Sequence, residues 1–240
     1  MPATPFIDII RTVFPVLAMS PDQGEQAARP DFFGTAFCVA PGVFMTAEHV
    51  VREAVAVGVV AIGGPAGASQ LLGAARAEQV ETWPERDIAL IFCGAREMKP
   101  LNTWMINRVQ VLTDLRAFGY PHAVTWSPEG DKLQVVFRAY KGYVITTRGF
   151  ERLDGSPSVY EVSSPYPVGM SGAPVLVTDG DGVAVAGVVV GTDTVTYAGV
   201  PQSVGIAITA EEIVDLNSAI LGGPVAATLN FDGARMGSPI

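Results

Sequence analysis

Short runs of β-branched residues, separated by glycine and proline, recur along the whole chain and limit the folds open to it. Val (32), Ile (13) and Thr (16) make up 61 of the 240 residues, and these residue types favour strands. Gly (26) and Pro (18) place turn signals between the runs. The pattern is typical of many short strands joined by tight turns, so we expect an all-β protein.

The runs predict about a dozen strands and a single helix. Helical periodicity appears only near the C-terminus, where Ile213, Leu216 and Ile220 share one face of a helix predicted over residues 210–221 after a capping Thr209. The Gly-rich tail, residues 222–240, is expected to be poorly ordered. This element content favours one or two β-barrels. The predicted strands cover residues 9–19, 32–40, 44–46, 55–62, 88–93, 111–118, 133–140, 143–147, 159–162, 174–177, 183–190 and 205–208.

Composition narrows the range of partners. Charged residues are 16% of the chain and hydrophobic residues 49%, which excludes a disordered protein. A net charge of −9 without a Lys/Arg run argues against nucleic acid and against a membrane surface as partners. The longest uncharged stretch, residues 54–75, is interrupted by Gly and Pro and does not predict a membrane span. The N-terminus lacks the basic region of a signal peptide, so a cytoplasmic location is expected.

Cysteine and histidine are few and widely separated. Cys38 and Cys93 lie in apolar, strand-like runs, which favours two buried and reduced thiols. The two histidines, His49 and His122, show no metal-ligand spacing with them. We therefore expect no metal and no cofactor.

Three polar residues together suit nucleophilic acyl transfer, which needs a hydroxyl, a base and a carboxylate that orients the base. His49 lies where a strand turns into a short helical segment, and Asp87 lies at the mouth of an apolar strand. Ser171 lies in a tight loop of small residues, 167–174. Each alone has an ordinary structural explanation: an exposed histidine, a turn-capping aspartate and a Gly-Ser turn. The functional interpretation depends on all three.

The order of these residues separates the hydrolase classes. The triad of an α/β-hydrolase runs Ser, acid, His, but both histidines precede Ser171. The subtilisin order, Asp, His, Ser, would require alternating strands and helices, which are absent, although it stays formally open through Asp8, Asp22 or Asp31. The order His49, Asp87, Ser171 is that of the chymotrypsin triad.

With these motifs the chain resembles the trypsin/chymotrypsin-like serine proteases over residues 14–221. The motifs similar to that family's T-A-A-H, D-I-A-L and G-D-S-G-G-P are Thr46-Ala47-Glu48-His49, Asp87-Ile88-Ala89-Leu90 and Gly169-Met170-Ser171-Gly172-Ala173-Pro174. Two further segments resemble the bacterial HtrA-type branch, Gly34-Thr35-Ala36-Phe37 and Gly205-Ile206-Ala207-Ile208. We expect no appended PDZ domain.

The resemblance implies a single protease domain, residues 1–221, of two six-stranded Greek-key β-barrels over about 1–110 and 111–209, with the triad in the cleft between them. It implies that Ser171 attacks the scissile carbonyl, that His49 transfers the proton and that Asp87 holds the imidazole. The backbone N–H groups of Gly169 and Ser171 would form the oxyanion hole. His122 is left as a structural residue.

The resemblance also assigns substrate-binding residues. A proline six positions before Ser171, where trypsin-like specificity needs an acid, disfavours cleavage after Arg or Lys and favours a small or medium apolar residue. A carboxylate at the pocket rim, Asp193, could still attract a basic side chain. Residues 191–193 are expected to pair with the substrate backbone as an added strand. The residues assigned to the pocket are Pro165, Tyr166, Gly191, Thr192, Asp193 and Val204.

Two departures from the family pattern leave two hypotheses open. Met170 replaces the acid that a newly cut N-terminus salt-bridges in digestive members, so the serine loop is either ready-made or ordered by a partner, ligand or oligomer. Ala173 replaces a glycine. The first hypothesis is a serine endopeptidase that acts on protein or peptide substrates, with a regulatory protein partner as a further expectation. The alternative is a catalytically silent peptide-binding module.

Overall fold

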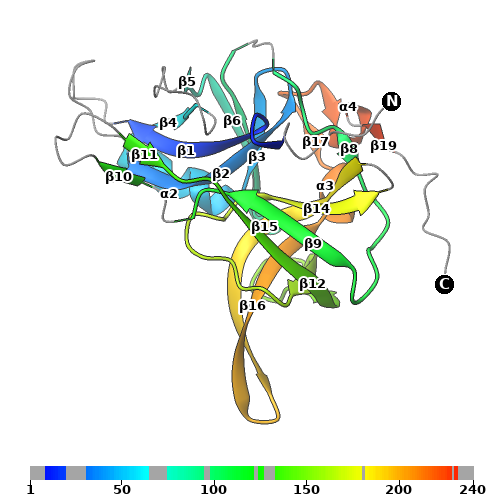
Figure 1. Cartoon of the computed structure of the whole chain (residues 1–240). Coiled ribbons are helices and arrows are strands. Elements are labelled where there is room, and N and C mark those ends of the chain that lie inside the picture. The colour runs from blue at the N-terminus through cyan, green and yellow to red at the C-terminus, as the bar shows by residue number, and fades with distance from the viewer. Residues whose placement is uncertain are drawn as a thin grey trace.

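Two curled, mainly antiparallel sheets, packed against each other, make up most of the molecule (Figure 1). The computed structural model describes residues 9–19, 31–64, 75–94, 98–121, 124–126, 133–179, 182–228 and 230–231. The prediction of an all-β chain with two barrel-like halves is confirmed. His122 lies outside the described residues.

The first sheet has seven strands in the order β5-β4-β1-β2-β3-β7-β6. Its inner face buries apolar side chains such as Phe14 and Phe44, whose ring centroids are 5.1 Å apart in an edge-to-face contact. Among the described residues no pairing closes this sheet into a ring. The strands are β1 (Val13–Met19), β2 (Asp31–Ala40), β3 (Val43–Thr46), β4 (Val59–Ile62), β5 (Ala75–Arg76), β6 (Gln79–Trp83) and β7 (Ile88–Phe92).

The second sheet contains a closed barrel. Its order is β14-β9-β12-β13-β16-β15-β8-β19, and an additional pairing of β14 with β15 joins six of these strands into a ring. The short strands β8 and β19 extend the sheet outside the ring. The strands are β8 (Thr103–Trp104), β9 (Asp114–Gly119), β12 (Arg138–Gly149), β13 (Ser158–Val162), β14 (Pro174–Asp179), β15 (Gly182–Tyr197), β16 (Val200–Thr209) and β19 (Asn230–Phe231). Two small ladders pair β10 (Val124–Trp126) with β11 (Leu133–Val135), and β17 (Asn217–Ser218) with β18 (Gly223–Pro224).

One buried cluster joins the two halves, and each half also has a cluster of its own. The largest buried cluster contains Phe37 from the first sheet together with Trp104 and Leu176 from the second. The rings of Phe37 and Trp104 lie with centroids 6.0 Å apart. The buried Tyr120 hydroxyl donates a hydrogen bond of 3.0 Å to the Val13 carbonyl across the same boundary.

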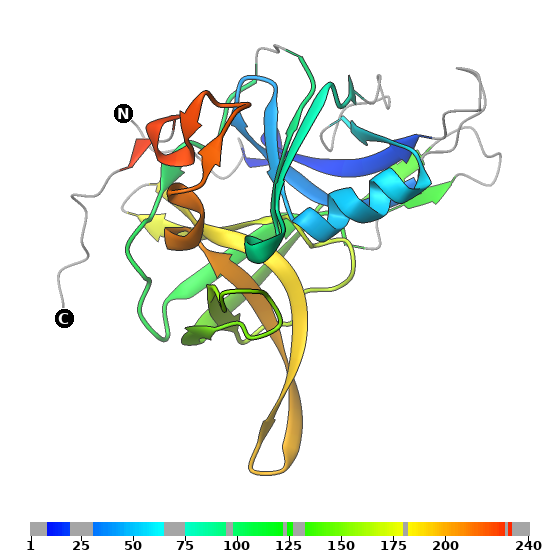
Figure 2. The ribbon, with the colours of Figure 1, turned by 180° about the vertical axis from the view of Figure 1, so that it is seen from behind.

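A ten-residue helix, α2 (Glu48–Val57), lies across the first sheet (Figure 2). The strand predicted over residues 55–62 is therefore wrong at its start, since residues 55–57 are helical and only β4 is extended. Val50, Val51 and Ala54 are buried on one side of the helix, and this tertiary burial outweighs the strand preference of valine.

The C-terminal helix is shorter than predicted. Instead of residues 210–221, α3 covers Glu211–Val214, because the chain turns at Leu216 and then forms the β17–β18 ladder. Thr209 does not cap it; the preceding residue is Ala210, and no side chain bonds to the helix start. The tail predicted to be poorly ordered contains β18, α4 (Val225–Thr228) and β19, and β19 pairs in parallel with β8.

The hairpin formed by β15 and β16 extends well beyond the barrel body (Figures 1 and 2). The sequence predicted only its two base segments, residues 183–190 and 205–208, as strands. The structure continues both strands to Tyr197 and from Val200, with cross-strand pairs along the whole length.

Candidate active site

Asp87 fixes the position of His49. A single 3₁₀ turn, η1 (Pro84–Arg86), ends at Asp87, whose backbone is left-handed with φ 49°, before β7 begins at Ile88. The Asp87 carbonyl accepts a 3.1 Å hydrogen bond from the Glu48 N–H, and its carboxylate accepts one of 2.9 Å from the His49 N–H. The first turn of α2 is therefore anchored on Asp87.

The same carboxylate holds the imidazole ring. His49 Nδ1 lies 2.8 Å from Asp87 Oδ2 and 3.0 Å from Oδ1, with the aspartate side chain 7% exposed and the histidine side chain 25% exposed. Burial lowers the pKa of His49, but the hydrogen bond and negative charge of Asp87, helped by Glu53, outweigh burial and raise the pKa above 6.5. With Nδ1 donating to Asp87, the other ring nitrogen is the one left to accept a proton.

Ser171 approaches the same region from the second barrel. Its backbone carbonyl accepts a 2.9 Å hydrogen bond from the Thr35 N–H. A Cβ built on Gly34 would lie 2.9 Å from that carbonyl and 2.7 Å from Val50 Cγ2, the neighbour of His49 on α2. The Ser171 hydroxyl donates 3.1 Å to the Val190 carbonyl. Within the described part of the chain it makes no hydrogen bond to His49, so the structure forms the His49–Asp87 contact but not the third contact of a triad.

The loop before Ser171 contains a type II turn. The Met170 N–H donates 3.0 Å to the Pro167 carbonyl, and Gly169 at the third turn position has φ 93°, the conformation for which glycine is preferred there. Among the described residues neither the Gly169 N–H nor the Ser171 N–H has an acceptor. The loop thus presents two unpaired amide donors next to the serine.

Thr35 of β2 clamps this loop, and sequence reasoning gave it no role. Its hydroxyl donates a hydrogen bond of 2.7 Å to the Gly169 carbonyl and accepts one of 3.0 Å from the Tyr120 N–H. Its carbonyl accepts 2.7 Å from the Thr46 hydroxyl, and a Cβ on Gly172 (φ 84°) would collide with that carbonyl. The only signal in the sequence was the segment Gly34-Thr35-Ala36-Phe37, one of the two segments that resemble the HtrA-type branch.

Met170 anchors the loop from the other side. The residue is completely buried in the apolar cluster of the second barrel, together with Tyr166 and Ala173. A methionine at this position therefore holds the loop by apolar packing, where the resemblance would place an acid that forms an ion pair.

The residues assigned to the substrate pocket are brought together in part. The Thr192 hydroxyl accepts a hydrogen bond of 2.8 Å from the Tyr166 N–H and donates one of 2.7 Å to the Tyr166 carbonyl. The Tyr166 ring lies against Gly205, where an added Cβ would be 2.6 Å from the ring. Pro165 is exposed, whereas Val204 packs in the core cluster that joins the two barrels.

Asp193 is already paired within the chain. Its carboxylate contacts Arg148 at 3.4 Å and Arg152 at 2.5 Å, and the Thr194 N–H donates 2.8 Å to it. Both arginines lie over the Phe150 ring, 5.7 and 5.9 Å from its centroid. A basic substrate side chain would have to compete with two arginines for this charge.

The described ranges also bear on three other features: a metal site, a reactive thiol and a membrane span. No three His, Cys, Asp or Glu side chains gather there in a way that could hold a metal ion. Cys38 and Cys93 are buried and are not joined in a disulfide, and burial raises the pKa of Cys38 to about 12. Among the helices that the structure describes, none is both long and apolar enough to cross a membrane.

Two packed barrel-like halves, with a histidine-aspartate pair from one and a glycine-rich serine loop from the other, are the arrangement of the double-barrel serine proteases. Residues 34–188 match the family described as the trypsin-like peptidase domain. The chain belongs to this family and is a serine protease.

Solved structures share the fold at low identity. The active form of the protease Rv3671c from M. tuberculosis superposes with a TM-score of 0.59 at 20% identity, over 89% of this chain and 85% of that one. The MamO protease domain from Magnetospirillum magneticum gives 0.59 at 16% identity, over 88% and 98%. The HtrA-type protease AlgW, with a decapeptide, superposes with a TM-score of 0.59 at 15% identity, over 85% of this chain and 62% of that one. No curated protein matches the chain.

Proposed function

We propose that the chain hydrolyses peptide bonds through His49, Asp87 and Ser171 by way of an acyl-enzyme intermediate. The observation that carries this proposal is the contact of His49 Nδ1 with the buried Asp87 carboxylate, 2.8 Å long, next to the clamped serine loop. Orientation by a buried carboxylate is what a general base in acyl transfer requires.

The proposed reaction has two stages, acylation of the serine and hydrolysis of the acyl-enzyme. Ser171 Oγ forms a bond to the scissile carbonyl carbon while its proton passes to His49 Nε2, and the Gly169 and Ser171 N–H groups stabilise the resulting oxyanion. The imidazolium, stabilised by Asp87, gives the proton to the leaving amine as the peptide bond breaks. Water, deprotonated by His49, then cleaves the acyl ester and regenerates the serine.

Substrate binding would complete the triad. In this structure the Ser171 hydroxyl donates a hydrogen bond to the Val190 carbonyl. An extended substrate offers its own backbone N–H to that carbonyl when it pairs with β15. The displaced hydroxyl is then free to turn toward His49, so no proteolytic activation is needed for this step. A regulatory protein partner that assists it stays a prediction.

We propose a small apolar residue before the scissile bond. The Tyr166 ring occupies the space beside Gly205, and Thr192 is fixed to the Tyr166 backbone, which leaves little room for a large side chain. Cleavage of a proteome-derived peptide library measures the preference. Predominant cleavage after Arg, Lys or Phe would contradict it.

A fluorophosphonate probe tests the catalytic assignment. We expect the wild-type chain to be labelled covalently, Ser171→Ala not at all, and His49→Ala only at a trace rate, with thermal melting as a check that each variant is folded. Peptide binding without labelling or turnover in the wild type would support the silent binding module instead.

A further inference from the structure

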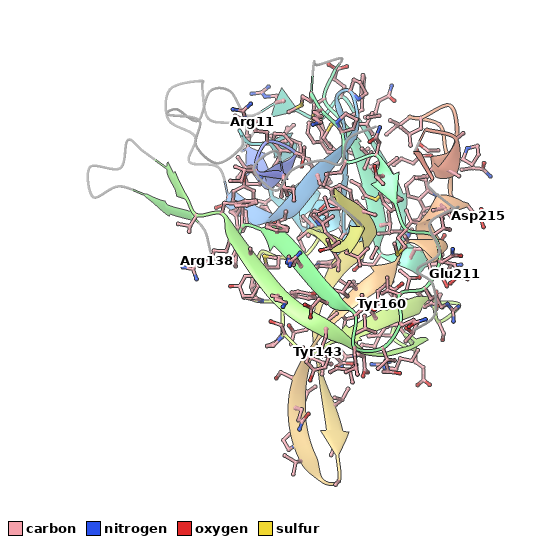
Figure 3. All side chains as sticks on the ribbon, turned by 45° about the vertical axis from the view of Figure 1, so that its right-hand side comes forward. Arg11, Arg138, Tyr143, Tyr160, Glu211 and Asp215 are labelled. Atoms are coloured by element: carbon pink, nitrogen blue, oxygen red, sulfur yellow. The ribbon has the colours of Figure 1, made fainter. Side chains whose placement is uncertain are left out.

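The projecting hairpin of β15 and β16 is the largest feature that the catalytic proposal does not explain. Its tip is a two-residue turn in which Ala198 has φ 49° and Gly199 has φ 80°, values of a type I′ turn. The hairpin extends away from the barrel, and none of the described helices and strands lies beside its outer half (Figure 3).

The turn determines which backbone groups face outward. A two-residue type I′ turn makes Tyr197 and Val200 a hydrogen-bonded pair, and hydrogen-bonded and non-hydrogen-bonded pairs alternate from there. Residues 193 and 195 therefore direct their N–H and C=O groups to β16. Thr192, Thr194 and Thr196 direct theirs to the opposite edge of β15.

That edge has no partner strand in the described structure. β14 pairs with β15 only as far as Val188, and β8 contacts it only at Val185. At the base of the edge, the register shifts between Val189 and Gly191, and the Val190 carbonyl accepts the Ser171 hydroxyl. The open edge thus begins at the serine and continues to the hairpin tip.

The two edges of the hairpin differ in their capacity to pair. Pro201 lies opposite Thr196 in a non-hydrogen-bonded pair, so the N–H that proline lacks would have faced the outer edge of β16, and that edge is blocked. The edge of β15 contains no proline. Its Thr194 N–H is held by the Asp193 carboxylate, while the Thr194 carbonyl stays available.

We infer that the outer edge of β15 binds the substrate as an added antiparallel strand that reaches far beyond residues 191–193. Counting back from the scissile bond, the first substrate residue pairs with Val190, the third with Thr192, the fifth with Thr194 and the seventh with Thr196. The substrate class is then an unfolded polypeptide segment, extended for about seven residues before the cleavage site. This inference rests on the proposed function for the position of the scissile bond.

Backbone methylation of a peptide tests the alternation. The probe is a fluorescein-labelled eight-residue peptide of Thr and Val that ends in alanine, and its binding to Ser171→Ala is measured by fluorescence anisotropy. Peptide residues are counted back from the C-terminal alanine. Methylating the backbone nitrogen of the fifth residue removes the donor to the Thr194 carbonyl and should weaken binding about five- to tenfold. The same methyl on the fourth or sixth residue should change binding less than twofold. Equal effects at the fourth and fifth residues would overturn the inference.

Shortening the hairpin gives the matched test. Asn-Gly replaces residues 194–203, so that a type I′ turn closes on the hydrogen-bonded pair Asp193 and Val204. The eight-residue peptide should then bind only as well as its C-terminal four-residue form, whose own affinity should not change. An unchanged preference for the long peptide would contradict the inference.

The reactivity of Ser171 is measured separately from peptide binding. We expect the shortened enzyme with Ser171 intact to react with the fluorophosphonate probe at the wild-type rate, because the triad lies outside the deleted segment. If neither the wild-type nor the shortened enzyme is labelled by the probe, the proposed function fails. Labelling in both forms with no dependence on peptide length would mean that only the extended edge fails.

Discussion

Asp87 combines several tasks in a single residue. Its left-handed backbone ends η1 and starts β7, its carbonyl and carboxylate receive the first N–H groups of α2, and the carboxylate also holds His49 Nδ1. Asp and Asn tolerate the left-handed region better than most residues. Replacement by asparagine therefore keeps the backbone while it removes the charge.

The pH dependence of hydrolysis tests this pair. The proposed base works only as the neutral imidazole, and Asp87 raises the pKa of His49 above 6.5, so kcat/KM should rise with pH through a midpoint above 6.5. Asp87→Asn should move the midpoint down, since burial then dominates. It should also lower kcat by about 10⁴-fold, the loss known for this substitution in the chymotrypsin triad. A pH profile identical in both enzymes would contradict the assignment.

At the scale of elements, the decisive contact is between strand β2 and the serine loop. Thr35 connects Gly169 and Ser171 of that loop to Tyr120 and Thr46 elsewhere in the fold. The hydroxyl is completely buried and bonds on both sides. The turn that presents the Gly169 N–H is therefore held from the first barrel, which gives the loop a support independent of any cut N-terminus.

Thr35→Val tests this positioning role. Valine keeps the shape but leaves the Gly169 carbonyl and the Tyr120 N–H without their partner, so kcat should fall about 10²-fold with little change in KM. Stability should fall by about 1–3 kcal/mol. Thr35→Ser keeps the hydroxyl and should restore kcat to within a few-fold of wild type. If both variants lose activity equally, the hydroxyl has no positioning role.

At the scale of the whole molecule, the largest core cluster is shared by the two halves. The cluster around Phe37, Trp104 and Leu176 draws side chains from both sheets, and the Tyr120 hydroxyl bonds to Val13 across the boundary. Because this shared cluster couples the two halves, we expect a single cooperative unfolding transition.

Calorimetry of Tyr120→Phe checks this coupling. The variant removes the hydroxyl that satisfies the Val13 carbonyl and should lower the free energy of unfolding by about 1–2 kcal/mol. The transition should stay single, with equal calorimetric and van't Hoff enthalpies. Two separate transitions, with only one of them shifted, would show that the barrels unfold independently.

The sequence predicted much of this structure because strand formation and turn chemistry are local. The strand-forming runs predicted β2, β3, β7, β13 and β14 close to their observed bounds, whereas β1 begins at Val13 and not at residue 9. The errors lie where packing decides: the valines of α2 are helical because one side of the helix is buried, and α3 ends early because the chain turns back to form a ladder. The hairpin tip was not predicted; its residues Thr194 and Thr196 are exposed, so no burial marks it as a strand.

Three motifs in the order His49, Asp87, Ser171 were enough to indicate the class of protein, since few folds place such residues in that order. The distances between the side chains of the site, and the directions in which its backbone groups point, could be read only from the folded chain. The Thr35 clamp, the Ser171 hydroxyl on Val190 and the open edge of β15 depend on residues far apart in sequence. Local periodicity reports which residues are buried, whereas only the packed structure decides which backbone groups remain unpaired and which way they face.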